Sequence, residues 1–131
     1  MALSADRNTP ERAARDFAFA PASGQTVYRG ALVCLNASGE LVKGAVATTL
    51  KALGRADTGT LDAGFDGKVR GRRGCFRWKN SSAGDAITDA DWGSTVYIVD
   101  DETVAKTNGT NTRSAAGICR GVDAEGVWVE T

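Results

Sequence analysis

The chain has 131 residues, of which 42% are hydrophobic and 24% charged, with 16 Gly and only 2 Pro; this composition argues against wholesale disorder and predicts one turn-rich globular domain. The 16 Lys and Arg balance 16 Asp and Glu, and this zero net charge withholds the long-range attraction to phosphate that nucleic-acid-binding proteins normally have. With no His and three scattered Cys, a zinc site and a disulfide scaffold are not expected, and no stretch approaches the ~18 apolar residues of a membrane-spanning helix.

Residues 1–20 predict an extended, charged arm ahead of the domain. Residues 1–10 are polar and contain no apolar leader, so we expect the protein to be made and to fold in a reducing cytoplasm. Thr9 followed by Pro10 resembles the start of a helix, with Thr as the N-cap. Few large apolar residues accompany them, so any such helix has little face to bury and is marginal on its own.

Two aromatic residues mark the end of this arm. In residues 16–20, Phe alternates with smaller residues, which places Phe17 and Phe19 on one side of an extended segment. Such a segment either pairs as an edge strand and closes the domain's own core, or inserts its aromatic rings into a partner. The sequence leaves both interpretations open.

Residues 21–131 predict a single β domain. Short runs of β-branched, aromatic and other apolar residues alternate with turns rich in Gly, Asn and Asp. Their spacing, roughly 8 to 12 residues, is typical of an all-β fold, either a compact β-sandwich or a small barrel, in a jelly-roll-like arrangement. The predicted strands lie within residues 25–28, 31–35, 41–43, 48–56, 68–79, 95–99, 103–106, 115–119 and 127–129.

The clearest local prediction is a β-hairpin at residues 95–106. It starts with a β-branched and aromatic run, turns at the acidic residues 100–102 and then resumes strand-like chemistry. Val96 and Ile98 point to one face and Tyr97 to the other, and both faces are substantially apolar. We therefore expect both to be covered, by a second sheet, a barrel interior or a partner chain.

Four residues outside the hairpin are also expected to be buried. Each of the three Cys lies in or beside a predicted strand, where a thiol acts as a small hydrophobic residue. Residues 87–93 predict a loop with one helical turn, capped by Thr88 or Asp89, which tucks its aromatic residue under the fold. The four residues are Cys34, Cys75, Cys119 and Trp92.

Residues 68–79 combine cations with aromatic residues. In a strand, Phe76 and Trp78 fall on one face, and Arg77 and Lys79 fall on the other. Proteins that bind single-stranded nucleic acid stack bases on aromatic faces and pair cations with phosphates. A single-stranded nucleic-acid-binding β-barrel is therefore the alternative function, although the core competes for the same two rings. In this alternative, Arg72 and Arg73 supply further cations for the phosphates.

No arrangement in the sequence supports catalysis. Without His, the group that most often titrates near neutral pH is missing, and a Cys nucleophile lacks its usual base. Two acidic pairs, Asp89 with Asp91 and Asp100 with Asp101, lie in predicted loops, where local hydrogen bonding alone favours carboxylates. The sequence contains no EF-hand spacing, phosphate-binding loop or dinucleotide fingerprint. We expect no enzymatic activity, no metal and no cofactor.

The balanced charge is unevenly distributed along the chain. Residues 51–79 carry eight Lys and Arg against three Asp and Glu, a net charge of +5, whereas residues 80–131 carry three against nine, a net charge of −6. This asymmetry either provides complementary binding surfaces or reflects two solvated faces without a function.

Several motifs resemble those of the capsid decoration, or cement, proteins of tailed bacteriophages. They cover about two thirds of the chain and include the early Gly-Ala-Leu-Val segment. The sequence departs from the family's pattern in its longer charged N-terminal arm. The motifs are Gly-Cys-Phe at residues 74–76, Asp-Ala-Asp-Trp-Gly at 89–93, the Val-Tyr strand with its acidic turn at 96–101, Ala-Gly-Ile at 116–118 and the opening at 27–33.

This resemblance implies a β domain on the outer capsid surface of the virion that bridges neighbouring major capsid subunits. It also implies a dimer or trimer, with neither a membrane nor nucleic acid as a partner. Deleting residues 1–16 is then expected to abolish capsid attachment and to leave the domain folded. The predicted partner-binding residues are Arg7, Arg12, Arg15, Phe17, Phe19, Arg72 and Arg73.

Overall fold

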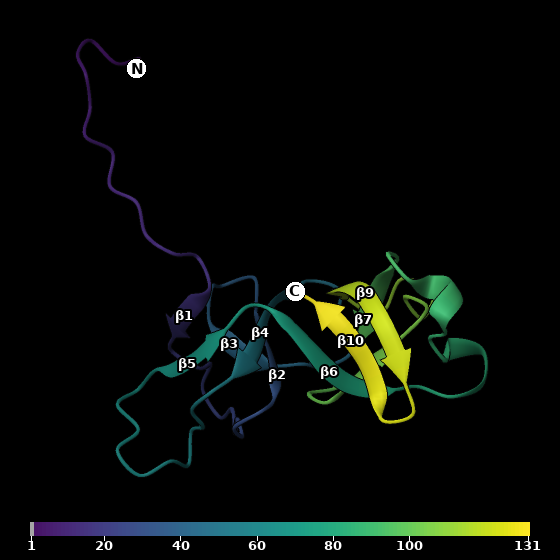
Figure 1. Ribbon diagram of the computed structural model, residues 1–131. Coiled ribbons are helices and arrows are strands. Elements are labelled where there is room, and N and C mark those ends of the chain that lie inside the picture. The colour runs from purple at the N-terminus through teal and green to yellow at the C-terminus, as the bar shows by residue number, and fades with distance from the viewer. Residues whose placement is uncertain (1) are drawn as a thin grey trace.

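The computed structural model describes residues 2–131 and consists almost entirely of short β-strands, which confirms the predicted all-β fold class (Figure 1). Two short 3₁₀ turns, Ala83–Asp85 and Asp89–Asp91, interrupt the second half of the chain. The strands are β1 (Asp16–Phe19), β2 (Leu32–Leu35), β3 (Leu41–Lys43), β4 (Lys51–Ala56), β5 (Val69–Arg72), β6 (Cys75–Asn80), β7 (Thr95–Ile98), β8 (Thr103–Ala105), β9 (Ala115–Asp123) and β10 (Gly126–Glu130).

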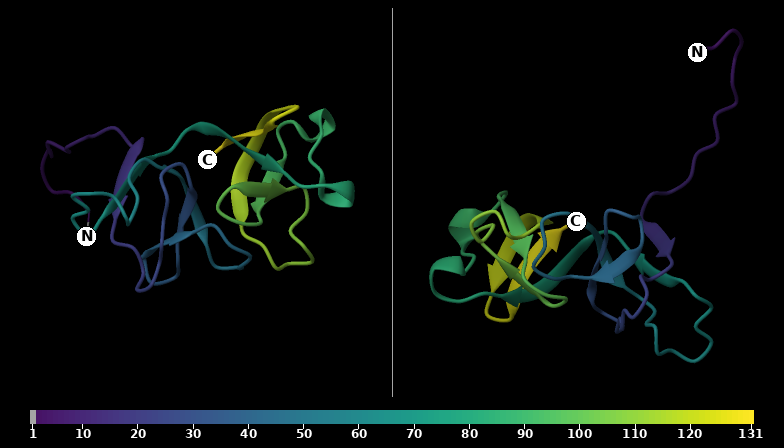
Figure 2. Two further views of the ribbon diagram at one scale, coloured as in Figure 1. Left: turned by 90° about the horizontal axis from the view of Figure 1, so that it is seen from below. Right: turned by 180° about the vertical axis from the view of Figure 1, so that it is seen from behind.

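The strands form two halves that lie side by side (Figures 1 and 2). The sheet half, residues 16–73, is an antiparallel five-stranded sheet in the order β1-β5-β4-β2-β3. The barrel half, residues 74–131, closes in the order β10-β6-β8-β7-β9, with β6 and β8 parallel. Only Arg73 and Gly74 separate β5 from β6, so one extended segment runs from the sheet into the barrel.

Strand β2 belongs to the sheet but contributes to two hydrophobic cores. Leu32 and Cys34 are buried with the barrel residues, whereas Val33 on the opposite face is buried with the sheet residues. Successive side chains of a strand alternate between its faces, and an apolar run without a polar face suits a strand that is covered on both sides. Burial raises the pKa of the Cys34 thiol to about 12. The two halves are therefore packed together through β2.

The predicted hairpin is confirmed as β7 and β8. Tyr97 pairs with Ala105 and Ile98 pairs with Val104 in an antiparallel register. Val96 and Ile98 are fully buried in the barrel interior, but Tyr97 on the outer face remains half-buried. The expectation that both faces are covered is thus correct for the inner face and only partly correct for the outer one.

Residues 25–28 do not form the predicted strand. Val27 is fully buried, yet its backbone N–H donates to Thr60 Oγ1 at 3.0 Å, and its carbonyl oxygen accepts from the Thr60 N–H at 2.9 Å. The loop at residues 57–67 therefore supplies the partners that a neighbouring strand would otherwise provide. The prediction was wrong because a long-range loop contact satisfies this backbone.

The burial prediction for the cysteines is confirmed for Cys34 and Cys119 and is wrong for Cys75, which is exposed. Strand alternation explains the difference, since Trp78 and half-buried Phe76 point inward while Cys75 and Arg77 point outward. The predicted arrangement of aromatic and cationic faces in this strand is correct, and Cys75 lies on the cationic face.

Residues 2–15 form neither a helix nor a strand and extend away from the sheet half (Figure 1). The helix start considered at Thr9 and Pro10 does not form, in keeping with the few apolar residues beside it. Strand β1 then begins at Asp16 and pairs with β5, so the free arm ends at residue 15 rather than at residue 20.

Candidate partner-binding surface

The base of the arm is fixed to the sheet by β1. Phe17 lies opposite Gly71, where a Cβ atom would collide with the Arg55 carbonyl oxygen and the Phe17 ring. Phe17 and Phe19 lie with their ring centroids 6.2 Å apart, and both are half-buried against the core of the sheet half. The structure thus uses these rings to close the domain's own core, the first of the two interpretations, and leaves part of each ring exposed.

The predicted arginines fall into two groups. Arg15 and Arg73 meet at the base of the arm, where the Arg73 N–H donates to the Arg15 carbonyl oxygen at 2.7 Å. Arg72 also lies at this base, but its Nε pairs with Asp57 Oδ2 at 3.1 Å. The structure does not bring Arg7 and Arg12 to this cluster, because both lie along the extended arm.

Four of these five arginines have no ion-pair partner among residues 2–131. The ten ion pairs of the described chain include Arg72, whose partner Asp57 also binds Arg55 at 3.0 Å. An unpaired guanidinium keeps its full charge available for a partner, whereas a paired one must first lose its carboxylate. The unpaired arginines are Arg7, Arg12, Arg15 and Arg73.

The charge asymmetry of the sequence persists in the fold. Residues 2–73, the arm and the sheet half, carry eleven Lys and Arg against seven Asp and Glu, a net charge of +4; residues 74–131 carry five against nine, a net charge of −4. Every ion pair joins two residues of the same half, so no described pair compensates this difference. The molecule therefore has a cationic arm-and-sheet end and an anionic barrel end.

The aromatic residues of β6 are not arranged as a base-stacking platform. Trp78 is only 5% exposed and lies in the barrel core, and the half-buried Phe76 is covered by the Arg55 guanidinium 4.6 Å from its ring centroid. The cations of this strand are engaged as well: Arg77 pairs with Glu125 at 2.8 Å, and Lys79 pairs with Glu102 at 2.9 Å.

Two exposed tryptophans were not predicted as surface residues. Trp92 was expected beneath the fold, but it is 61% exposed and lies over the Arg120 guanidinium, 4.9 Å from its ring centroid. The expected helical turn forms as a 3₁₀ turn, and Thr88, one of the two predicted caps, precedes it; the turn ends at Asp91, and the Trp92 side chain that follows turns outward. Trp128 is 39% exposed on β10, where it alternates with buried Val127 and Val129. The alternation of Trp128 with Val127 and Val129 is the sequence signal that could have identified Trp128 as a surface residue.

Charged neighbours and hydrogen-bond donors perturb the titration of several exposed or half-buried carboxyl groups. Hydrogen bonds from Arg70 hold the pKa of Asp66 at about 2. The backbone N–H of Gly59, with help from Arg29, lowers the pKa of Asp62. A hydrogen bond from the Thr107 hydroxyl lowers the pKa of Asp85, and the Glu125 N–H lowers that of Asp123. Across residues 2–131, no three His, Cys, Asp or Glu side chains are grouped so as to hold a metal ion.

These depressed pKa values predict an acid-sensitive fold. A carboxyl group whose pKa is lower in the folded state stabilises that state above its ordinary pKa near ~4, and the contribution is lost as the pH falls through the folded-state pKa. The thermal unfolding midpoint should therefore fall as the pH is lowered from about 4 to about 2, and Asp66→Asn should make this decline shallower. Asp89→Asn, at an exposed acid without an ion pair, is the matched control, and an equal effect of both substitutions would contradict the explanation.

The fold and its surface define an all-β protein with a free cationic arm, a charge-segregated body and two exposed tryptophans. No protein-family model, curated protein or solved structure matches the chain. Within the described part of the chain, no helix is both long and apolar enough to span a bilayer. Evidence for the function of this chain therefore comes from its surface chemistry and from the motif resemblance.

Proposed function

We propose that this protein is a non-enzymatic structural protein of a tailed-phage virion, which is made in the host bacterial cytoplasm and binds the outer surface of the capsid. It joins neighbouring major capsid subunits and stabilises the shell. The observation that carries the proposal is the free arm of residues 2–15, whose three arginines have no ion-pair partner in the described chain. The motif resemblance supports the same function.

The arm has the reach that such a role requires. An extended segment of fourteen residues spans up to about 45 Å, and β1 holds its base on the rigid sheet. Arg7 and Arg12 can therefore contact a surface well beyond the domain, while Arg15 and Arg73 contact the surface beneath it. Area and complementary charge across such an extended contact provide the affinity.

The exposed parts of Phe17 and Phe19 complete the proposed contact at the base of the arm. The inner surfaces of the two rings pack against the core, so only their outer edges are available to the capsid. Arg72 contributes less than Arg73, because Asp57 already neutralises it. The contact region thus combines unpaired cations with partly exposed aromatic rings, a composition typical of interface centres.

Co-sedimentation with empty, DNA-free phage shells tests this proposal. The purified full chain is expected to bind saturably, at a fixed copy number per capsid subunit, and a labelled single-stranded oligonucleotide in the same mixture should remain free. Salt-sensitive binding to the oligonucleotide without shell binding would overturn the proposal in favour of the nucleic-acid alternative. Two observations argue against that alternative: Trp78 is buried, and the cations of β6 are paired.

A further inference from the structure

An open hollow of about 310 Å³ lies where the sheet half meets the barrel half. One wall comes from residues 50–52 at the start of β4, and the other comes from residues 115–117 at the start of β9. Arg73 and Thr131 complete the lining. We call this feature the seam hollow.

Hydrogen bonds fix the two walls of the seam hollow. The Leu50 backbone N–H donates to Ser114 Oγ at 3.1 Å, and the buried Ser114 hydroxyl donates to the Ala47 carbonyl oxygen at 2.6 Å, so these bonds join the two halves. The Thr131 hydroxyl donates to the Ala116 carbonyl oxygen at 3.2 Å. The hollow is therefore formed before a partner binds, which lowers the free-energy cost of ordering it on binding.

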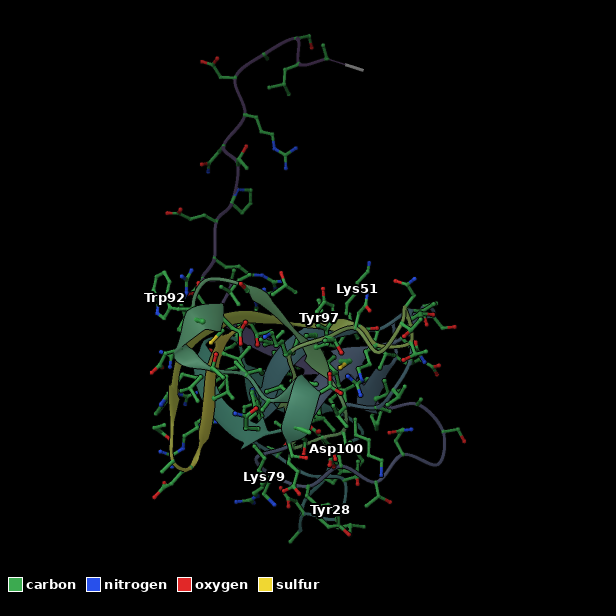
Figure 3. The ribbon with its side chains drawn as sticks, turned by 90° about the vertical axis from the view of Figure 1, so that its right-hand side faces the viewer. Tyr28, Lys51, Lys79, Trp92, Tyr97 and Asp100 are labelled. Atoms are coloured by element: carbon green, nitrogen blue, oxygen red, sulfur yellow. The ribbon has the colours of Figure 1, made fainter. Side chains whose placement is uncertain are left out.

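Two cations line the seam hollow, and no acidic side chain does. Lys51 and Arg73 are exposed, and neither belongs to any of the ten ion pairs of residues 2–131. The hydrogen bond from the Arg73 N–H to the Arg15 carbonyl oxygen brings a third unpaired arginine beside Arg73. Lys51 lies on the side of the body from which the arm extends, whereas Asp100 lies on the opposite side (Figure 3). The seam hollow is therefore a site of positive potential.

The rest of the lining is small and uncharged. Leu50 and Ala52 are half-buried, and Ala115 on the opposite wall is exposed, so the hollow offers apolar surface between the cations and the barrel. Carboxylates form charge-assisted hydrogen bonds with Lys and Arg, and burial of apolar surface adds free energy of binding. An inorganic anion would meet the cations but leave the apolar surface in water, whereas an acidic peptide segment can satisfy both.

We propose that the seam hollow binds an extended segment of another protein in which Glu or Asp residues are interspersed with small apolar residues. The carboxylates pair with Lys51 and Arg73, and the small side chains cover the apolar lining. A nucleic acid fits less well, because the lining contains no aromatic ring on which a base could stack. If the partner is the major capsid subunit, this contact supplements that of the arm. That consequence depends on the proposed capsid function, but the binding of an acidic segment does not.

Fluorescence polarisation with a labelled, N-acetylated peptide of alternating Glu and Ala tests the binding in the absence of capsids. The full chain is expected to bind this peptide at low salt and to leave the matched peptide of alternating Gln and Ala free. The double variant Lys51→Gln/Arg73→Gln should raise the dissociation constant by about tenfold. Lys43→Gln/Lys68→Gln removes two unpaired cations outside the hollow and should raise it by no more than about twofold.

Ala115→Glu tests the hollow without removing a cation. The substitution places a carboxylate in the hollow and should raise the dissociation constant of the Glu-Ala peptide by at least about fivefold. Ala124→Glu adds the same charge at an exposed Ala in the turn between β9 and β10 and should have a smaller effect. Both side chains are exposed, and circular dichroism melting checks that the two variants remain folded.

Amide chemical shifts of the isotope-labelled full chain locate the bound peptide. Shift changes are expected at residues 50–52 and 115–117. Changes confined to residues 2–15, or no binding at low salt, would overturn the proposal. Equal effects of the two double variants, or of the two Ala→Glu variants, would also overturn it. Tighter binding of a single-stranded oligonucleotide at the same residues would assign the hollow to nucleic acid instead. Because no shells are present, failure of this binding is distinguishable from failure of the capsid function.

Discussion

Deletion of residues 2–14 is expected to abolish saturable binding to empty capsid shells while leaving the thermal unfolding midpoint unchanged. No described hydrogen bond or ion pair joins these residues to the rest of the chain, so the body loses neither kind of interaction. The deletion stops before Arg15 because its carbonyl oxygen accepts the Arg73 N–H and β1 begins at the next residue. Co-sedimentation and circular dichroism melting measure the two effects.

A charge-matched pair of variants separates the arm's cations from its length. Replacing Arg7, Arg12 and Arg15 together by Gln should weaken shell binding by at least about tenfold and make the remaining binding less sensitive to salt. Replacing the unpaired Lys43, Lys51 and Lys68 by Gln removes the same charge from the sheet half and should have a smaller effect. Full shell binding by the deleted chain, or an equal loss with both triple variants, would rule out the arm as the principal contact.

Leu32→Ala is expected to lower the free energy of unfolding by about 2–5 kcal/mol, the range for a buried Leu whose removal leaves a cavity. Leu32 is fully buried in the barrel core although its strand belongs to the sheet, and its backbone N–H donates to the Asp101 carbonyl oxygen at 2.8 Å. The cavity should therefore weaken both halves together. Urea denaturation followed by Trp fluorescence measures the loss in the barrel, where all three Trp lie.

Hydrogen exchange extends this test to the sheet half. In the Leu32→Ala variant, amide protection in β4 and β5 should fall in parallel with that in β7 and β9 if the two halves unfold as one unit. Leu61→Ala is the matched control, because this Leu is 71% exposed in the loop at residues 57–67 and its truncation should change stability by no more than about 0.5 kcal/mol. Loss of protection confined to one half would show that β2 does not couple them.

The predicted contact residues show what their local sequence could and could not determine. Phe17 and Phe19 were placed correctly on one face by alternation alone, but their burial depends on β5, whose paired residues lie fifty or more positions away in the chain. The neutralisation of Arg72 depends likewise on Asp57, which lies in a different segment. Whether a cation is free or paired depends on the fold, because its partner is the carboxylate that lies near it in space and not one that lies near it in the sequence.

Local chemistry by itself determined the all-β class, the hairpin of β7 and β8, the 3₁₀ turn capped by Thr88 and the unstructured arm. These features depend on neighbouring residues, through strand alternation, turn composition and the lack of an apolar helical face. Only the tertiary structure decided the barrel closure, the double burial of β2, and the outward position of Trp92, Trp128 and Cys75. Each of these depends on which distant strands pair, and a run of apolar residues does not encode whether one face or both will be covered.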